Sequence, residues 1–453
     1  MNRDFILGEE KPSSAVLKLS SPTAISTVST VIYNIIDTIF IGRYVFTLGI
    51  AAVSIYLPIQ MMIMSITQLF TSGVGSYISR ELGKKNKKNA EKATGSLIAF
   101  IFTLSILLCA FGLIFAKPIV EAFGAQGAVI PYASSYAKAM FIGILFYPLC
   151  IASNNIMRAE GASKHSMVGT IISIVSNIFL DFLFIVIFRW GVFGAGLATT
   201  ISKFINLMYL IYAFKFKTYL KVKVKYIRYD FKIIKKGLPI GFSTFLNQFV
   251  GSISIMLLNR DLYALGGNYV IAVYGIVYKL TSLIQRSVGG FSRGTQPLIG
   301  YNFGAKNISR IKACVKFSLL FSFIIATIGT ILLMIFSNAF TSMFTTNHKL
   351  IAYSSHILII ALLSSPLLGV YFLSISFFRA IGYAKESIIL SLFRRVIFFI
   401  PLLYILPYAF KMGIIGIWIT LPLSNFLSAI FASFFLFKTL KKLDKIEELK
   451  KVA

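Results

Sequence analysis

The chain has 453 residues, of which 57% are hydrophobic and only 13% are charged, about half of the roughly 25% charged residues in an ordinary soluble domain. This composition excludes a typical soluble globular protein. Lysine and arginine number 45 against 15 aspartates and glutamates, a formal net charge of +30. Because the bases lie between long apolar runs, they indicate membrane topology rather than a nucleic-acid surface.

Local motifs give no support to enzyme activity. The sequence has no GxxxxGK[ST] nucleotide loop and no HExxH zinc motif, so we expect neither ATP hydrolysis nor zinc-dependent proteolysis. The three cysteines lie singly in apolar segments, at Cys109, Cys150 and Cys314, which favours neither a disulfide framework nor a metal site. The N-terminus lacks the basic-then-apolar order of a cleavable signal peptide, and we expect the first hydrophobic helix to be retained.

Taken in chain order, about twelve apolar runs are long enough to cross a membrane, which takes about 20 residues. They predict an all-α integral membrane protein. Prolines and glycines inside several runs mark candidate hinges, since neighbouring helices can satisfy the backbone groups that they free. The runs are centred near Ser29, Met64, Ser105, Ile144, Asn177, Phe204, Gly251, Ile284, Ala326, Leu362, Pro401 and Leu427.

The basic residues set the expected orientation. With the N-terminus inside, the cytoplasmic segments hold 34 lysines and arginines, four of them from Arg379 to Arg395, and the outer segments hold six. This distribution follows the positive-inside rule. We therefore expect a multi-pass protein of the cytoplasmic membrane with both termini in the cytoplasm.

An internal repeat runs through the chain. The stretch FTSGVGSYISRELGKKN from Phe70 aligns without gaps on FSRGTQPLIGYNFGAKN from Phe291. At the same offset of 221 residues, MRAEGASKHS from Met157 matches FRAIGYAKES from Phe378. Two separate matches at one offset indicate two halves of six spans each.

The repeat predicts two lobes. Residues 1–214 form the expected first lobe, 215–236 a basic cytoplasmic linker, and 237–453 the second lobe with its tail; Pro22 in the first span corresponds to Pro239 in the seventh. Because six is an even number, both halves enter the membrane from the same side, and the pseudo-two-fold axis between them runs along the membrane normal. This arrangement is typical of transporters with a substrate site near mid-membrane.

Two acidic residues lie inside predicted spans, at Asp37 and Asp181, whereas the others lie in predicted loops, span ends or tails. A carboxylate at membrane depth is costly unless it is hydrated, protonated or paired, which makes both residues functional candidates; the alternative is a satisfied internal hydrogen bond. Asn34 precedes the first acid by three residues and Asn177 the second by four, so each amide shares a helix face with its acid. Such a group could bind a proton or Na⁺ through hard oxygen ligands. Because the second half has Leu402 in place of Asp181, we expect the coupling site in the first lobe.

Three bases recur every seven residues in the eighth span, at Lys279, Arg286 and Arg293. They occupy one stripe of that helix. We interpret the stripe as facing central water. The alternatives are contact with an anionic substrate, or a gate closed against backbone carbonyls.

The runs YNIIDTIFIGR, GVGSYISRELGKKN, RAEGASK and above all QPLIGYNFGAKN resemble the multidrug and toxic compound extrusion (MATE) transporters. The resemblance extends from Ser21 to Leu436. It implies a twelve-helix, two-lobed, V-shaped, cation-coupled antiporter that expels amphipathic and often cationic drugs. Some members place an acidic site in the second lobe, and this sequence lacks those acids.

The resemblance also implies a set of site residues. Prokaryotic members use a proline and an aspartate in the first helix, an asparagine in the fourth, an asparagine and an aspartate in the fifth, and a threonine in the sixth. Pro22 would be a hinge, Na⁺ would be held by Asp37, Asn177, Asp181 and Thr199, and the substrate cavity would involve Tyr33 and Asn154. The basic stripe of the eighth span, and not the resemblance, adds Lys279 and Arg286 to the candidate cavity residues. The coupling set is Asp37, Asp181, Asn177, Asn34, Asn154 and Thr199.

The sequence as a whole predicts a multidrug exporter driven by H⁺ or Na⁺, with no cofactor other than the coupling ion. Its expected partners are amphipathic drugs and the lipid bilayer, with no nucleic acid, and a monomer is expected. The alternative is a flippase for a lipid-linked or anionic lipid, in which the stripe from Lys279 to Arg293 would hold a phosphate. The two intramembrane aspartates argue against that alternative.

Overall fold

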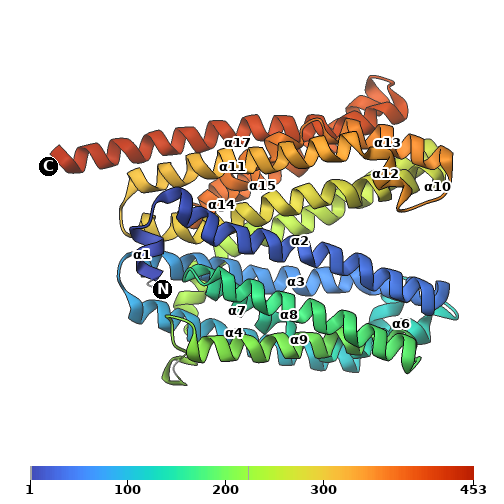
Figure 1. Cartoon of the computed structure of the whole chain (residues 1–453), viewed down its shortest axis with the longest axis horizontal. Coiled ribbons are helices and arrows are strands. Elements are labelled where there is room, and N and C mark those ends of the chain that lie inside the picture. Colours follow the sequence, from blue (N-terminus) through green and yellow to red (C-terminus); the bar gives the residue numbers. More distant parts are fainter. Residues whose placement is uncertain (1–2, 223, 453) are drawn as a thin grey trace. The chain divides into compact units, whose positions relative to one another are not determined.

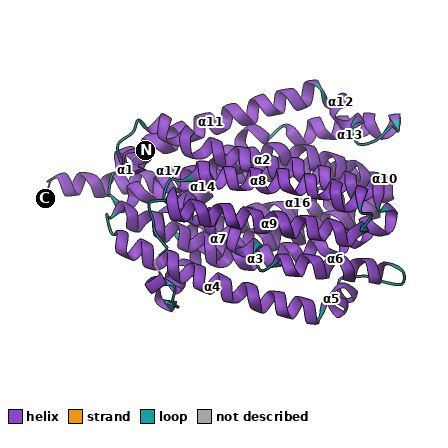
Figure 2. Cartoon of the chain, turned by 60° about the horizontal axis from the view of Figure 1, so that its bottom comes forward, coloured by secondary structure: helices purple, strands orange, loops and turns teal. Residues whose placement is uncertain are grey.

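The computed structural model describes residues 3–222 and 224–452. Within these ranges every regular element is a helix and no strand is present (Figure 2), which confirms the all-α prediction. The chain forms two compact units. The first unit comprises Met1–Leu7 and Ile25–Gly241, and the second comprises Gly8–Ala24 and Phe242–Ala453.

Eleven helical elements lie wholly or mainly in the described part of the first unit. Its long helices pack along their neighbours, α8 against α9 and α3 against α4 (Figure 1). The elements are α2 (Pro12–Tyr44), α3 (Phe46–Gly83), α4 (Lys87–Ile114), α5 (Ala116–Ala122), α6 (Val129–Gly143), α7 (Tyr147–Ala159), α8 (Ser163–Asp181), the π-helical turn η1 (Phe182–Ile187), α9 (Gly191–Phe216) and η2 (Val224–Tyr226), preceded by the short α1 (Arg3–Gly8).

The second unit repeats much of this order. Its first helix, α10, is continuous in hydrogen bonding, but Gly267 has φ 65° and ψ −162° and divides it into two helices. The elements are α10 (Phe231–Gly304), α11 (Ile308–Ile335), α12 (Ser337–Ser342), α13 (His348–Leu362), η3 (Ser365–Leu367), α14 (Leu368–Ile381), α15 (Ala384–Leu392), the π-helical turn η4 (Phe393–Phe399), α16 (Ile400–Tyr404), the π-helical turn η5 (Ile405–Ala409) and α17 (Gly413–Val452).

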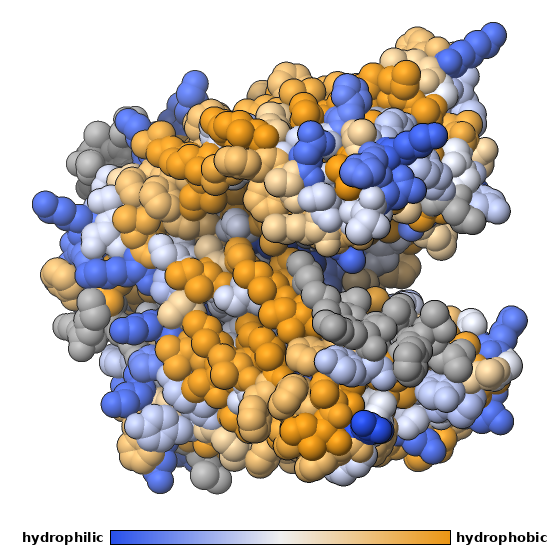
Figure 3. All heavy atoms as spheres, turned by 45° about the vertical axis from the view of Figure 1, so that its right-hand side comes forward, coloured by the Kyte–Doolittle hydropathy of each residue, from blue (hydrophilic) through white to orange (hydrophobic). Residues whose placement is uncertain are grey.

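Nine helices of the described chain are long and apolar enough to cross a membrane, and the number rises to eleven if two bent pairs each form one span. The sequence predicted about twelve. The predicted span that is missing from this set is the part of α10 after Gly267, where Lys279 and Arg286 lower the apolar content. Apolar side chains cover broad areas of the face in Figure 3, and hydrophilic residues gather near the edges.

The backbone carries the duplication that the sequence predicts. Residues with positive φ, which non-glycine residues rarely adopt, recur in both halves at an offset of 221 or 222 residues. The bent pairs also correspond, with 42° between α6 and α7 and 41° between α13 and the segment Ser365–Ile381. The positive-φ pairs are Lys85 and Lys306 (58° and 61°), Gly161 and Gly382 (84° and 91°), Arg189 and Lys411 (56° and 53°), and Gly191 and Gly413 (58° and 55°).

Only one of the two π-helical turns of the second unit has a counterpart in the first unit. The turn η5 corresponds to η1 of the first unit at the same offset, whereas the stretch that corresponds to η4 is ordinary α-helix within α8. Short π-helical segments are rare and often mark functional positions. The difference therefore points to a local change in the second half.

Each unit contains the start of a helix that continues in the other unit. Residues 8–24 of α2 belong to the second unit and residues 231–241 of α10 to the first, whereas the sequence assigned the whole of each helix to one lobe. Close backbone contacts hold both segments. A Cβ atom on Gly73 would lie 1.9 Å from the carbonyl oxygen of Gly237, and one on Gly294 would lie 2.3 Å from the Cα atom of Ser20. Glycine permits this approach of two helices.

The basic segment predicted as a cytoplasmic linker is packed against the first unit. The buried Glu160 accepts a hydrogen bond from the backbone N–H of Leu220 (2.8 Å), and the hydroxyl of Ser96 accepts one from the N–H of Asp230 (3.0 Å). Its path is therefore fixed by contacts as well as by the attraction of its bases to the membrane surface.

Two glycines on one helix test the close packing. We expect Gly73→Ala to destabilise the protein by about 1–3 kcal/mol, because the added methyl group has no room. Gly75→Ala is the matched control, since its Cβ would meet its nearest neighbour at an ordinary 3.6 Å. Thermal unfolding of the purified variants measures the difference. Equal unfolding temperatures would contradict the packing argument.

Candidate functional site

Two buried acids from distant parts of the chain meet inside the first unit. Asp181 ends α8 and is fully buried, and Asp37 lies half-buried on α2. Their carboxyl groups lie within hydrogen-bonding reach of each other. Two carboxyl groups can form a hydrogen bond only when one carries a proton, because two bare carboxylates repel. The structure thus brings together the two acids that the sequence singled out.

An amide fixes one side of this pair. The amide of Asn177 satisfies both neighbours when its nitrogen faces Asp181 and its oxygen faces Thr199. In this orientation it donates to Asp181 Oδ2 at 2.9 Å and accepts from the backbone N–H of Thr199 at 3.2 Å. The Oδ1 atoms of Asp37 and Asp181 are buried and accept no hydrogen bond from the described protein. Buried acceptors of this kind are costly. They are the atoms to which a proton or a hard cation would bind.

Residues that the sequence did not assign surround the acids. The phenol of Tyr33 is hydrogen-bonded to Thr199, as the site prediction suggests, but Tyr136 of α6 is also buried next to the acids. Lys203 interacts electrostatically with Asp37. Its position four residues after Thr199, on the same face of α9, is the sequence signal that could have found it.

Lys203 is held by aromatic rings and a hydroxyl. Its Nζ atom lies 5.6 Å from the ring centres of both Tyr33 and Tyr147 and donates to Ser173 Oγ at 3.1 Å. Cation–π contact stabilises a buried ammonium group. The site therefore combines two acids with one base.

Other predicted site residues lie elsewhere. Asn154 accepts a hydrogen bond from Ser166 (2.8 Å), which is eleven residues before Asn177 on α8, roughly 16 Å along the helix. The side chain of Asn34 is exposed. Neither amide is therefore buried with the acids, although both lie in the first unit.

The predicted hinge and the predicted basic cavity residues belong to the second unit. Pro22 lies inside α2, two residues before the point where that helix passes from the second unit to the first. Lys279 and Arg286 are exposed on α10 and line neither of the cavities described below.

A cavity adjoins the acids. Part of it is open to the outside. Thr199 and Lys203 contribute to both the cavity wall and the acid site. An apolar and aromatic lining with a few polar groups suits an amphipathic ligand. The wall comprises Tyr56, Gln60, Ile63, Met140, Gly143, Ile144, Tyr147, Thr199, Thr200 and Lys203.

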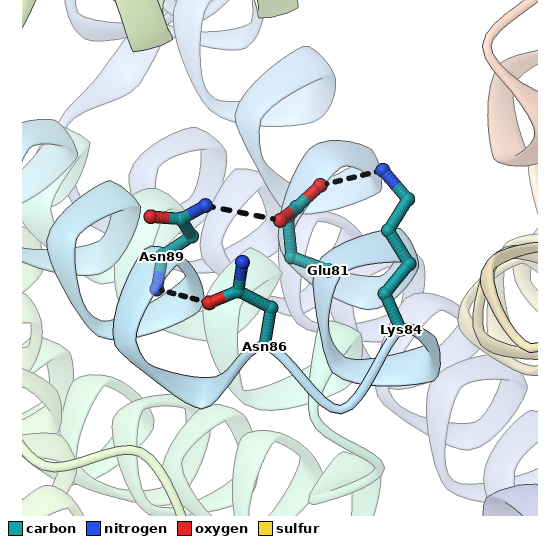
Figure 4. Close-up of polar contacts among 4 residues, drawn as sticks. All are labelled: Glu81, Lys84, Asn86 and Asn89. Carbon is teal, nitrogen blue, oxygen red and sulfur yellow. Dashed lines mark hydrogen bonds and ion pairs between the residues drawn. The ribbon is translucent and has the colours of Figure 1, made fainter.

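A third buried acid has a structural role. Glu81, in the loop motif of the repeat, accepts from Lys84 at 2.8 Å and from the side chain of Asn89 at 3.4 Å (Figure 4). The side chain of Asn86 accepts from the N–H of Asn89 and caps α4. Because the loop itself satisfies this acid, Glu81 fixes the connection between α3 and α4.

One sequence assignment is wrong. Arg394 and Arg395 were grouped with the bases at the cytoplasmic membrane edge, but they lie ten residues inside the candidate span Ala384–Ala409, and Arg394 is only 7% exposed. The hydropathy pattern alone did not separate these two arginines from the nearby loop.

Comparisons with known proteins agree with this architecture. The family model described as MatE matches residues 22–183 and 239–405. "Multidrug export protein MepA" from Staphylococcus aureus (strain NCTC 8325 / PS 47) is 31% identical over 425 residues, with 92% of each chain covered. The protein of the same name from Staphylococcus saprophyticus subsp. saprophyticus is 28% identical over 418 residues, again with 92% of each chain covered.

Solved structures share the fold. "Crystal structure of MATE in complex with MaD3S" superposes with a TM-score of 0.93 at 24% identity and covers 98% of this chain and 99% of its own. "Outward-facing conformation of a multidrug resistance MATE family transporter of the MOP superfamily" superposes with a TM-score of 0.93 at 23% identity and the same coverage.

Cysteine cross-linking tests the contact between the acids. In a variant without native cysteines, we expect Asp37→Cys combined with Asp181→Cys to form a disulfide under mild oxidation, because the two side chains touch. Asn34→Cys combined with Asp181→Cys is the control and should remain reduced, since the side chain of Asn34 is exposed whereas Asp181 is fully buried. Mass spectrometry of the cross-linked peptides measures both. A cross-link in the control alone would contradict the site.

Proposed function

The chain belongs to the MatE family of multidrug transporters, and we propose that it exports amphipathic organic cations in exchange for protons. It is a multi-pass membrane protein and not an enzyme. The observation that carries the coupling proposal is the close approach of the carboxyl groups of Asp37 and Asp181 inside the first unit. A bacterial cytoplasmic membrane is the proposed location.

The chemistry of the pair favours H⁺ over Na⁺. Two bare carboxylates at this distance repel each other, and a shared proton removes that repulsion. The ammonium group of Lys203, which interacts with Asp37, would repel a Na⁺ ion bound at the acids.

The net charge of the acid site would couple proton binding to the binding of an organic cation. With Lys203 charged, the site carries −1 when both acids are ionised, zero when they share one proton, and +1 when both are protonated. An organic cation in the adjoining cavity binds best at −1 and is released as protons bind. Thr199, which belongs to both the acid site and the cavity wall, brings the two events close together. Coupling energies of this kind are typically 1–3 kcal/mol, or about 5–150-fold in affinity.

The remaining features fit this proposal. Pro22, inside α2 near its passage between the units, would let that helix bend as the two acids gain or lose their shared proton. The excess of bases in the predicted cytoplasmic segments favours both termini in the cytoplasm, and we propose a monomer. The flippase alternative has less support, because Lys279 and Arg286 line neither described cavity.

Transport into inside-out vesicles tests the proposal. We expect an acid interior to drive uptake of a fluorescent organic cation, and an imposed Na⁺ gradient to have no effect. Asp37→Asn and Asp181→Asn should each reduce uptake at least tenfold, because neither variant can cycle through the charge of −1. Asp261→Asn removes a buried acid of the second unit and is the matched control.

Two outcomes would contradict proton coupling at Asp37 and Asp181. One is uptake driven by Na⁺ alone. The other is normal proton-driven uptake in both aspartate variants at wild-type expression levels.

A further inference from the structure

The second unit contains a cavity with basic walls. Part of it is open to the outside, and it is larger than the cavity of the first unit. Arg394 and Arg395 both contribute to its wall, together with the polar side chains of Gln285 and Asn425. No aspartate or glutamate lies among the described residues that form this wall. A cavity with two positive charges and no negative one favours an anionic ligand.

Arg394 is fixed in one orientation. Its Nε atom donates to Asn425 Oδ1 at 3.2 Å, and its guanidinium carbon lies 4.7 Å from the ring centre of Tyr371 and 5.5 Å from that of Phe372. Among the described residues, no carboxylate forms an ion pair with it. A buried charge without a counter-charge is costly at membrane depth, whereas a planar guanidinium held in place is well suited to bind a carboxylate.

Comparison of the two halves shows that this site is specific to the second one. At the offsets of 221 and 222 residues found for the backbone pairs, Arg394 corresponds to Ser173 and Asn425 to Lys203, respectively. These are the two residues that are hydrogen-bonded in the first unit. In the first unit the base projects from α9 toward the acids, and in the second it projects from the π-helical turn η4, where Leu402 takes the place of the acid Asp181.

We propose that this cavity binds the carboxylate of an amphipathic organic anion or zwitterion. Arg394 and Arg395 hold the negative group, and the amides of Gln285 and Asn425 orient it. Tyr274 and Phe399, also in the wall, flank the apolar part of the ligand. The proposal rests on the proposed export function for the direction of transport, and it adds a second class of substrate to the organic cations.

Direct binding tests the site without any transport. The probe is 9-anthracenecarboxylate, titrated by fluorescence into the full-length protein in phosphatidylcholine nanodiscs. We expect saturable binding that is at least tenfold weaker in Arg394→Gln and weaker in Arg395→Gln. Arg286→Gln, an exposed arginine of the same unit outside the cavity, is the matched control and should bind like the wild type.

Two further variants separate a binding defect from misfolding. Arg394→Lys keeps the charge but loses the two-pronged geometry, and we expect intermediate affinity. Asp181→Asn, which affects only the first unit, should leave the affinity for the anion unchanged. If the anion site is correct and the cation-export proposal is not, Asp181→Asn will retain both cation uptake and anion binding, so the two failures are distinguishable.

Three results would overturn the proposal. The first is wild-type affinity in both Arg394→Gln and Arg395→Gln. The second is the absence of saturable binding to the wild type. The third is loss of binding when phosphatidylglycerol is added to the nanodiscs, because competition by that lipid would make an anionic headgroup, and not a carboxylate substrate, the occupant.

Discussion

The contact between the carboxyl groups of Asp37 and Asp181 is the interaction on which the first unit depends. It joins α2 to the end of α8, and a shared proton would remove the repulsion between the two carboxylates. Asn177 holds one acid in place, Thr199 links that amide to the cavity wall, and Lys203 supplies a balancing charge. A change of protonation therefore changes both the attachment of one helix to another and the electrostatic potential of the adjoining cavity.

The second unit has the same backbone turns as the first unit, but different side chains at the positions that correspond to the acid site. Positive-φ residues recur at the same offset, so the loops of the duplicated unit still require the same turns. Leu402 takes the place of the acid Asp181, and the base of the second unit, the buried Arg394, lies on the neighbouring helix. The two halves of the repeat thus carry one cavity next to two acids and another with two arginines in its wall.

The sequence predicted those features that depend on local pattern. The length of the apolar runs predicted most of the spans, and the shared offset of two sequence matches predicted the repeat. The cost of placing an ion in lipid identified Asp37 and Asp181 as site residues. Features that depend on contacts between distant helices were missed or misplaced. Lys203 gave only a spacing signal, Asn154 is bonded to Ser166 instead of the acids, and Arg394 lies on a π-helical turn that no hydropathy pattern indicates.

The first turns of α2 and of α10 each pack in the opposite unit, and this affects the order in which the protein can fold during synthesis. Residues 231–241 complete the first unit, and residues 8–24 belong to the second. During synthesis the early segment is therefore made long before the second half, with which it packs. An ancestor with a single half would have needed to exchange the same segment with an identical copy, as in a swapped dimer. Fusion of the two genes would then have made that exchange internal.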